Sequence, residues 1–146
     1  MNFSVTEMKE IHIAEIAKLE AECFSSPWSE NALSEELKNP NSHFLVACKD
    51  EILGYIGVQE ICGEAYITNI AVFNRFRGLG IGRKLLKTAI DAAKSRGCEF
   101  ITLEVRKSNS AAISLYLSEG FEEVGIRKNF YTAPQEDAVL YTRYFR

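Results

Sequence analysis

Apolar positions along the chain recur with two different periods, which together predict a mixture of helices and strands. A short strand near Phe3–Glu7 precedes a helical pattern that ends at Ser25, and Ser29 can cap a second short helix that runs to Lys38. The remaining expected elements are strands over His43–Lys49, Ile52–Ile61 and Ala65–Val72, a helix over Gly82–Arg96, a strand over Glu99–Arg106, a helix over Asn109–Ser118, and strands over Phe121–Phe130 and Ala138–Phe145.

This order of elements, β-α-α-β-β-β-α-β-α-β-β, is typical of an α+β sheet covered by helices. Tight connections at Lys49-Asp50-Glu51 and Cys62-Gly63-Glu64 indicate two antiparallel hairpins. The chain contains no repeat, low-complexity stretch or linker. The runs of Gly, Pro and Asn between its elements are brief, as expected when short loops join the elements of one unit. Residues 1–146 are therefore expected to form a single domain.

Composition narrows the class of protein. Of the 146 residues, 47% are hydrophobic and 25% are charged, which is the balance of a soluble globular protein. No apolar run approaches the roughly 18–20 residues that a membrane span needs, and the N-terminus shows no secretory pattern, so we expect a cytoplasmic protein without a membrane partner. The net charge of −3 and the pI near 5.5 argue against nucleic-acid binding as the main task.

The spacing of cysteine and histidine argues against a metal site. Cys23, Cys48, Cys62 and Cys98 include no closely spaced pair, and the two histidines stand alone in the sequence. We therefore expect four reduced structural thiols and no bound metal.

The segment Arg75–Arg83, with the sequence RFRGLGIGR, is the most informative part of the chain. It follows an apolar strand and opens an amphipathic helix, and its alternating glycines let backbone N–H groups turn toward one point without a side chain in the way. The first helical turn adds unpaired N–H groups and the positive end of the helix dipole, so the segment predicts a phosphate or pyrophosphate site. The cations of this region are Arg75, Arg77, Arg83, Lys84 and Lys87, and no acidic residue occurs between Glu64 and Asp91.

Other interpretations of this segment fit less of the pattern. A glycine-rich helix entry with solvated arginines is the structural alternative. The spacing Gly-x-Gly-x-Gly argues against a dinucleotide site, and so does the lack of an acidic residue that closes a following strand about twenty residues later. The lack of Gly-Lys-Ser/Thr argues against a Walker loop. A diphosphate site without a Mg²⁺-binding motif indicates a coenzyme whose diphosphate serves to anchor it, such as coenzyme A.

Several motifs resemble the GNAT superfamily of acetyl-CoA-dependent acyltransferases, and the resemblance runs from about Ser4 to Tyr144. The superfamily motifs are Asn69-Ile70-Ala71-Val72, Arg77-x-x-Gly80-x-Gly82, Leu103-Glu104-Val105-Arg106 and Asn109-x-x-Ala112-x-x-Leu115-Tyr116-x-x-x-Gly120-Phe121. Features similar to the ribosomal-protein-alanine N-acetyltransferase (RimI) branch are Phe24-x-x-Pro27-Trp28-Ser29, Asn129-Phe130-Tyr131 and Glu136-Asp137-Ala138.

This resemblance implies both a fold and an activity. The implied fold is a mixed, mostly antiparallel central sheet flanked by about four helices. The implied enzyme binds acetyl-CoA as a co-substrate, uses no metal, and transfers the acetyl group to the N-terminal α-amine of a protein by direct attack in a ternary complex. The implied acceptor is the N-terminal alanine of a small-subunit ribosomal protein, and the enzyme is expected to be a monomer or a weak dimer.

Glu104 is the candidate general base. Strand alternation places it on one face with Phe100, Thr102 and Arg106. An α-amine has a pKa of about 7.7–8.0, so reaching its neutral form at pH 7 costs roughly 1 kcal/mol, against about 4.6 kcal/mol for a lysine, and a carboxylate acting through water is a sufficient base. The resemblance implies the same role, and the alternative is a surface glutamate paired with Arg106 or Lys107.

Tyr116 is the candidate general acid. A phenol with a pKa near 10 can donate a proton as negative charge develops on the sulfur of a departing thiolate. The helical spacing of Tyr116 from Ala112 and Ile113 also fits a tyrosine that packs in the core with its hydroxyl bonded elsewhere. The match to the family's tyrosine favours the acid.

The resemblance also implies the ligand contacts. Acceptor contacts are implied for Phe24, Pro27, Trp28, Asn69 and Tyr131, and the alternative for Trp28 is an aromatic side chain that caps the core. Asn109 is implied to contact the coenzyme and is also expected to cap its helix. Coenzyme contacts are implied for Ile70, Ala71, Val72, Arg77, Gly78, Leu79, Gly80, Ile81, Gly82, Arg83 and Asn109.

Two other functions fit part of this pattern. An acetyltransferase acting on a small amine, such as a polyamine or an antibiotic, would need acidic residues around the amine, whereas Phe24, Trp28 and Tyr131 are aromatic. A non-catalytic acyl-CoA-binding module would bind the coenzyme without transferring its acyl group, and the presence of both Glu104 and Tyr116 argues against it.

Overall fold

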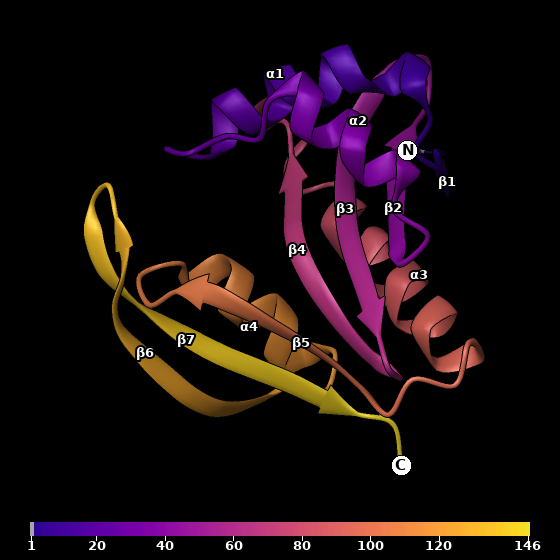
Figure 1. Ribbon diagram of the computed structural model, residues 1–146. Coiled ribbons are helices and arrows are strands. Elements are labelled where there is room, and N and C mark those ends of the chain that lie inside the picture. The colour runs from indigo at the N-terminus through magenta and orange to yellow at the C-terminus, as the bar shows by residue number, and fades with distance from the viewer. Residues whose placement is uncertain (1) are drawn as a thin grey trace.

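The computed structural model describes residues 2–146, and in this part of the chain seven strands form one sheet in the order β1-β2-β3-β4-β5-β7-β6 (Figure 1). The predicted order of strands and helices is confirmed, and two 3₁₀ turns are added that are too short to show a periodic pattern. The strands are β1 (Ser4–Glu7), β2 (Ser42–Cys48), β3 (Ile52–Ile61), β4 (Glu64–Val72), β5 (Phe100–Arg106), β6 (Glu122–Thr132) and β7 (Gln135–Tyr144). The helices are α1 (Ile13–Cys23), α2 (Glu30–Lys38), α3 (Ile81–Ser95) and α4 (Ser110–Ser118), and the 3₁₀ turns are η1 (Glu10–His12) and η2 (Asn74–Phe76).

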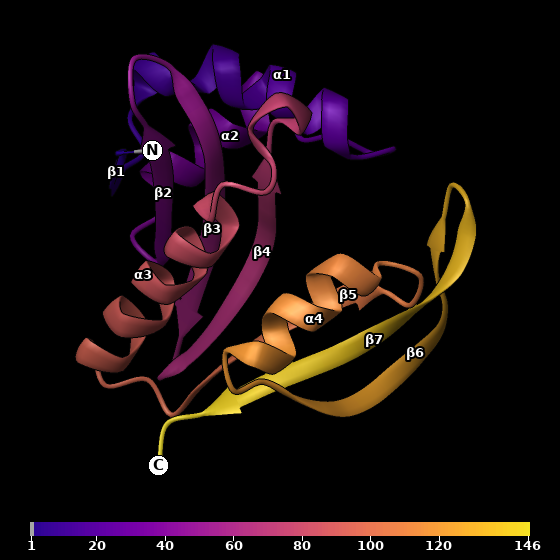
Figure 2. The ribbon, with the colours of Figure 1, turned by 180° about the vertical axis from the view of Figure 1, so that it is seen from behind.

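Helices cover both faces of the sheet, as Figures 1 and 2 show from opposite sides. α1 and α2 pack on one face, while α3 and α4 pack on the other. Strand alternation separates the two cores, because Tyr55 on β3 faces α1 whereas its neighbour Ile56 faces α3. The α3 side chains that are buried in the second core are Ile81, Leu85, Leu86, Ala89, Ile90 and Ala93.

The predicted N-caps of two helices are confirmed. Ser29 begins α2, and its hydroxyl oxygen accepts a hydrogen bond from the N–H of Ala32 at 3.1 Å. Asn109 begins α4, and its side-chain oxygen accepts one from the N–H of Ala112 at 3.2 Å. α3 starts differently, because Gly80 precedes it with a φ of +80°, a conformation that favours glycine.

The sheet opens between β4 and β5. These strands pair in parallel only over Glu64–Tyr66 and Phe100–Thr102, whereas the other neighbouring strands pair antiparallel. Beyond this short pairing, β4 continues along β3 and β5 continues along β7, so the two strands diverge (Figure 1). A register shift leaves Thr68 unpaired with β3, and this bulge lies where the strands separate. The mixed, mostly antiparallel sheet is therefore confirmed.

The last hairpin differs from the prediction. β6 extends to Thr132, and β7 begins at Gln135 rather than at Ala138. The cause is tertiary, because the guanidinium of Arg106 donates hydrogen bonds to both carbonyl oxygens of the Ala133–Pro134 turn, at 3.2 and 2.8 Å. Such a contact from a distant strand orders residues whose own pattern does not favour a strand.

Two expectations concern the chain as a whole. The four cysteines are free thiols, as expected, but only Cys98 is buried: Cys23 and Cys48 are half-buried, and Cys62 is exposed in the turn between β3 and β4. Within residues 2–146, no helix combines the length and the apolar character that crossing a bilayer requires.

Candidate active site

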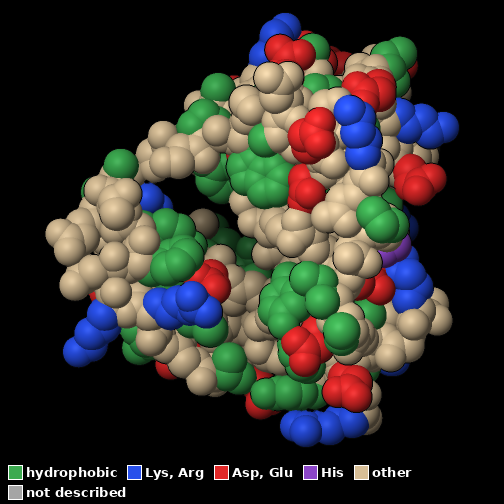
Figure 3. All heavy atoms as spheres, viewed as in Figure 1, with side chains coloured by type: hydrophobic (Ala, Val, Ile, Leu, Met, Phe, Trp, Pro, Cys, Tyr) green, Lys and Arg blue, Asp and Glu red, His purple; other side chains and the backbone are tan. Residues whose placement is uncertain are grey.

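A cleft of about 770 Å³ lies where β4 and β5 separate, and Figure 3 shows it as a hollow between the β6–β7 hairpin and the rest of the molecule. Its walls come from the loop after α1, from β4 and β5, from the start of α4, and from the hairpin. Both catalytic candidates and four of the five acceptor candidates therefore meet in one cleft. The predicted site residues that line it are Phe24, Trp28, Asn69, Ile70, Glu104, Asn109, Tyr116 and Tyr131.

The other predicted residues lie outside the lining of this cleft. Pro27 is exposed in the same loop as Trp28, and Ala71 is buried in β4. The predicted phosphate-binding residues 77–83 follow the η2 turn after β4 and run into the first turn of α3, a path that Figure 2 shows. The coenzyme candidates thus continue from the cleft along β4 into this loop.

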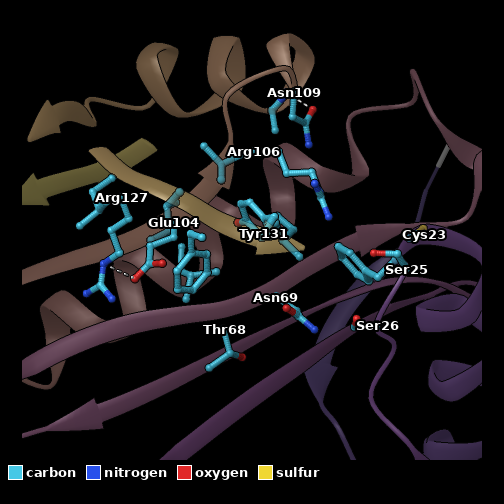
Figure 4. Close-up of a pocket in the computed structure, with 18 of the residues that line it drawn as sticks. Cys23, Ser25, Ser26, Thr68, Asn69, Glu104, Arg106, Asn109, Arg127 and Tyr131 are labelled. Atoms are coloured by element: carbon cyan, nitrogen blue, oxygen red, sulfur yellow. Dashed lines mark hydrogen bonds and ion pairs between the residues drawn. The ribbon is translucent and has the colours of Figure 1, made fainter. Parts of the chain in front are cut away.

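Glu104 projects a carboxylate from β5 into the cleft (Figure 4). Its Oε1 lies 3.5 Å from Nε of Arg127, whereas its Oε2 is buried without a hydrogen-bond partner among the described residues. The alternative of a surface glutamate paired with Arg106 or Lys107 is wrong in its partners. Arg106 binds the hairpin turn, and no ion pair joins Glu104 to Lys107 within residues 2–146. A buried oxygen without a hydrogen-bond donor lowers the stability of the protein when no ligand is bound, and it is free to accept a proton or a hydrogen bond.

Tyr116 is buried in the last turn of α4 and also lines the cleft. Its ring packs against Phe121 and Tyr141, with ring centroids 5.7 and 6.5 Å apart. Within the described part of the chain, no hydrogen bond engages its hydroxyl, so the expectation of a hydroxyl bonded elsewhere in the core is wrong. Burial raises the pKa of Tyr116, and Tyr131 adds to the shift, so the hydroxyl keeps its proton at neutral pH.

The loop before α3 exposes a run of backbone donors. Gly78 and Gly80 both have a φ of +80°, which an L-residue adopts only with strain. Among the described residues, no acceptor pairs with the backbone N–H groups of residues 78–83. Consecutive unpaired N–H groups at the start of a helix favour an anion, and the helix dipole adds to this preference.

The arginine side chains around this loop are engaged with the protein itself. Nε of Arg77 donates to the carbonyl oxygen of Val72 at 3.3 Å. Arg83 points to the far end of α4, where it donates to the hydroxyl of Ser118 at 2.9 Å and pairs with Glu119. The unengaged donors of the loop are therefore backbone groups.

Replacing Gly80 with alanine is expected to lower the free energy of unfolding by about 1–2 kcal/mol, because an L-residue at this φ is strained. Gly82 is the matched control, since its φ is not positive and an added Cβ would meet only Leu115 and Val72, at 3.8 and 3.9 Å. We expect Gly82→Ala to be neutral or to stabilise the protein by about 0.4–1 kcal/mol. Urea unfolding measures both changes, and equal losses would contradict the loop conformation.

Three residues near the cleft were not assigned a role from the sequence. Arg106 stacks over the ring of Tyr131 at 4.3 Å and, through its bonds to the hairpin turn, holds that ring in the cleft wall. Arg127 comes from the exposed strand β6 and pairs with Glu104. Glu20 is buried and accepts hydrogen bonds from Trp28 and Asn69, which line the cleft. Strand alternation predicts that Arg106 lies on the same face of β5 as Glu104. The roles of Arg106, Arg127 and Glu20 depend on contacts with distant elements, which the sequence pattern does not show.

Comparison with known proteins agrees with this geometry. The acetyltransferase (GNAT) family model matches residues 13–121. The ribosomal protein bS18-alanine N-acetyltransferase of Salmonella typhimurium is 37% identical over 125 residues, which cover 84% of each chain. The crystal structure of the ribosomal-protein-S18-alanine N-acetyltransferase from Escherichia coli matches with a TM-score of 0.90 at 30% identity, and the match covers 98% of this chain and 94% of that one. Arabidopsis thaliana NAA60 in complex with acetyl-CoA shares the fold, with a TM-score of 0.90 at 14% identity over 99% of each chain. This chain belongs to the acetyltransferase (GNAT) family.

Proposed function

We propose that this chain transfers the acetyl group of acetyl-CoA to the N-terminal α-amine of a protein, by direct attack in a ternary complex. The observation that carries the proposal is the Oε2 of Glu104, which has no hydrogen-bond partner among the described residues and lies in the same cleft as Tyr116. An attacking amine must lose a proton, and a departing thiolate must gain one. Glu104 is the proposed acceptor of the first proton, through water, and Tyr116 is the proposed donor of the second.

The path from β4 into the loop before α3 suits acetyl-CoA as the co-substrate. Its diphosphate is favoured by the start of α3 and by the N–H groups of residues 78–83, which have no acceptor in the described part of the chain. Within residues 2–146, the end of β4 over residues 70–72 pairs with β3 on one edge and with no strand on the other, so its free backbone groups can pair with the pantetheine amides. A coenzyme held in this way places its thioester where the strands separate, beside Glu104. Backbone N–H groups can polarise the carbonyl, so the proposed reaction uses no metal.

The proposed acceptor is the N-terminal alanine of a small-subunit ribosomal protein. The Salmonella and Escherichia coli relatives are named for this activity. The acceptor side of the cleft is aromatic, with Phe24, Trp28 and Tyr131 in its lining, and the Trp28 ring rests against Phe44 at 5.8 Å. Such a wall suits a peptide with a small first residue better than a polycationic amine. We place the reaction in the cytoplasm and propose that residues 1–146 perform it as one domain. The proposed enzyme is a monomer or weak dimer and acts without nucleic acid or membrane.

The test compares acceptors with the purified protein. Thiol release from acetyl-CoA is followed with an alanine-starting peptide, with the same peptide already acetylated at its α-amine, and with spermidine. We expect kcat/KM for the free peptide to exceed that for spermidine by at least about tenfold, and the blocked peptide to be inert. A preference for spermidine would favour the small-amine function. Binding of acetyl-CoA in a calorimeter without transfer to either amine would favour a binding module.

A measurement in cells identifies the acceptor. Mass spectrometry of protein N-termini, with and without this gene, is expected to show the loss of one acetyl group from an N-terminal alanine. Loss of acetyl groups from lysines alone would contradict the proposed acceptor class.

A further inference from the structure

A buried carboxylate lies directly beneath the acceptor side of the cleft. Glu20 on α1 is 0% exposed, and its hydrogen-bond donors come from three different parts of the fold. The hydroxyl of Tyr55 donates to Oε2 at 2.6 Å, Nδ2 of Asn69 donates to the same oxygen at 2.9 Å, and the N–H of Trp28 donates to Oε1 at 2.9 Å. Asn69 and Trp28 line the cleft, so the carboxylate of Glu20 reaches the site through these two residues.

This carboxylate determines which way the amide of Asn69 points. Oε2 of Glu20 accepts the hydrogen bond from Nδ2 of Asn69, so the NH₂ end of the Asn69 amide faces Glu20. Nδ2 also lies 3.2 Å from the hydroxyl oxygen of Tyr55, whose proton is already given to Glu20. Both contacts hold the nitrogen on the inner side. The amide oxygen is therefore fixed on the opposite side, which in Figure 4 is the side facing Tyr131.

We infer that Glu20 is a positioning residue, which fixes the amide oxygen of Asn69 as a hydrogen-bond acceptor for the N–H groups at the amino end of the acceptor. The inference rests on the proposed function, because it requires an acceptor amine in the cleft. Asn69 follows the Thr68 bulge, where β4 has already separated from β5, so its side chain borders the cleft instead of a neighbouring strand. A neutral amine still has N–H groups while its lone pair attacks, and an oxygen that binds one of them aims the lone pair.

The isosteric variant Glu20→Gln tests this orientation. Its NH₂ group can donate to Asn69, and the amide of Asn69 can then turn round and present its own NH₂ group to the cleft. We expect KM for an alanine-starting peptide to rise about tenfold, because an acceptor oxygen is replaced by a donor. The Kd of acetyl-CoA, measured by calorimetry, is expected to stay unchanged, because residues 78–83 do not touch this network.

A compensating variant separates orientation from general damage. In Glu20→Gln combined with Asn69→Asp, the amide at position 20 can donate to the carboxylate at position 69, whose second oxygen then faces the cleft. We expect the peptide KM to return most of the way to the wild-type value. A merely structural role predicts the opposite, since the second substitution disturbs the network further.

Ile16→Val is the matched control for stability. Ile16 is buried on the same helix, and removing its methyl group is expected to lower the Tm while leaving the hydrogen bonds of Glu20 and Asn69 in place. Its peptide KM is expected to equal that of the wild type. If Glu20→Gln does not fold, Asn69→Ala gives the same readout, because it removes the oxygen and leaves Glu20 in place.

The inference is overturned if Glu20→Gln or Asn69→Ala keeps the wild-type peptide KM, or if Ile16→Val raises it equally. Failure of the proposed function looks different, because it appears in the wild-type protein. A wild type that acetylates spermidine but no peptide rejects the proposed acceptor, and the same comparison of KM values with spermidine still decides the role of Glu20. If the wild type transfers to neither amine, the Kd of the peptide replaces KM in that comparison.

Discussion

Tyr116→Phe is expected to lower kcat about a hundredfold or more, while the Kd of acetyl-CoA stays at its wild-type value. Phenylalanine keeps the ring that packs against Phe121 and Tyr141, and the lost hydroxyl makes no hydrogen bond within the described residues, so the Tm is expected to change little. What disappears is the proton donor for the departing thiolate. Steady-state kcat at saturating substrate and calorimetric titration with acetyl-CoA measure the two quantities.

The surroundings of Tyr116 explain why this loss is large. Burial raises the pKa of its hydroxyl, which therefore holds its proton until a strong base forms beside it. The same dry surroundings raise the basicity of a developing thiolate, so proton transfer becomes favourable only as the C–S bond breaks. In the variant, a sulfur in this apolar region must leave as a bare thiolate or wait for a water molecule.

Tyr141→Phe is the control for the loss of a buried hydroxyl. Tyr141 is a neighbouring buried tyrosine whose pKa burial also raises, but it does not line the cleft. We expect its kcat to match the wild type. A Tyr116→Phe protein with wild-type kcat would exclude Tyr116 as the acid, and a rise in the Kd of acetyl-CoA alone would assign it a binding role.

The parts of the fold that the sequence predicts well are those decided by neighbours along the chain. The N-caps Ser29 and Asn109 bond to residues three positions later, so their roles follow from local sequence. The β6–β7 hairpin is different, because its turn is fixed by Arg106 from another strand. Its early start at Gln135 could not be predicted from a pattern that contains no such contact.

The site divides in the same way. The resemblance to the GNAT superfamily implies paired roles for Glu104 and Tyr116, and the fold brings both residues to one cleft. Glu20 could not be found in this way, since in the sequence it is one polar position in an amphipathic helix. Its partners Tyr55 and Asn69 lie on β3 and β4, and only the packing of α1 on the sheet shows that a buried carboxylate meets them.

Glu104→Gln is expected to reduce kcat/KM for an alanine-starting peptide about a hundredfold at pH 7, and the deficit is expected to shrink about tenfold by pH 9. The α-amine has a pKa of about 7.7–8.0, so its neutral fraction rises from about a tenth at pH 7 to more than nine-tenths at pH 9. The wild-type protein can bind the ammonium form and remove its proton in the cleft. The variant must wait for solvent to do so, which becomes easier as the pH rises.

Arg127→Gln separates loss of the base from loss of the ion pair. The pair joins Nε of Arg127 to Oε1 of Glu104 at 3.5 Å, and Arg127 is more than half exposed, so the contact itself contributes little. We expect this variant to keep activity within about fivefold of the wild type at every pH, because the carboxylate remains. Measurements of kcat/KM for all three proteins between pH 6.5 and 9.5 compare the profiles. If the ratio of wild-type to Glu104→Gln kcat/KM stays constant across this range, Glu104 orients the amine without removing its proton. Loss of a base should instead matter less as the pH rises, because the solvent then deprotonates the amine.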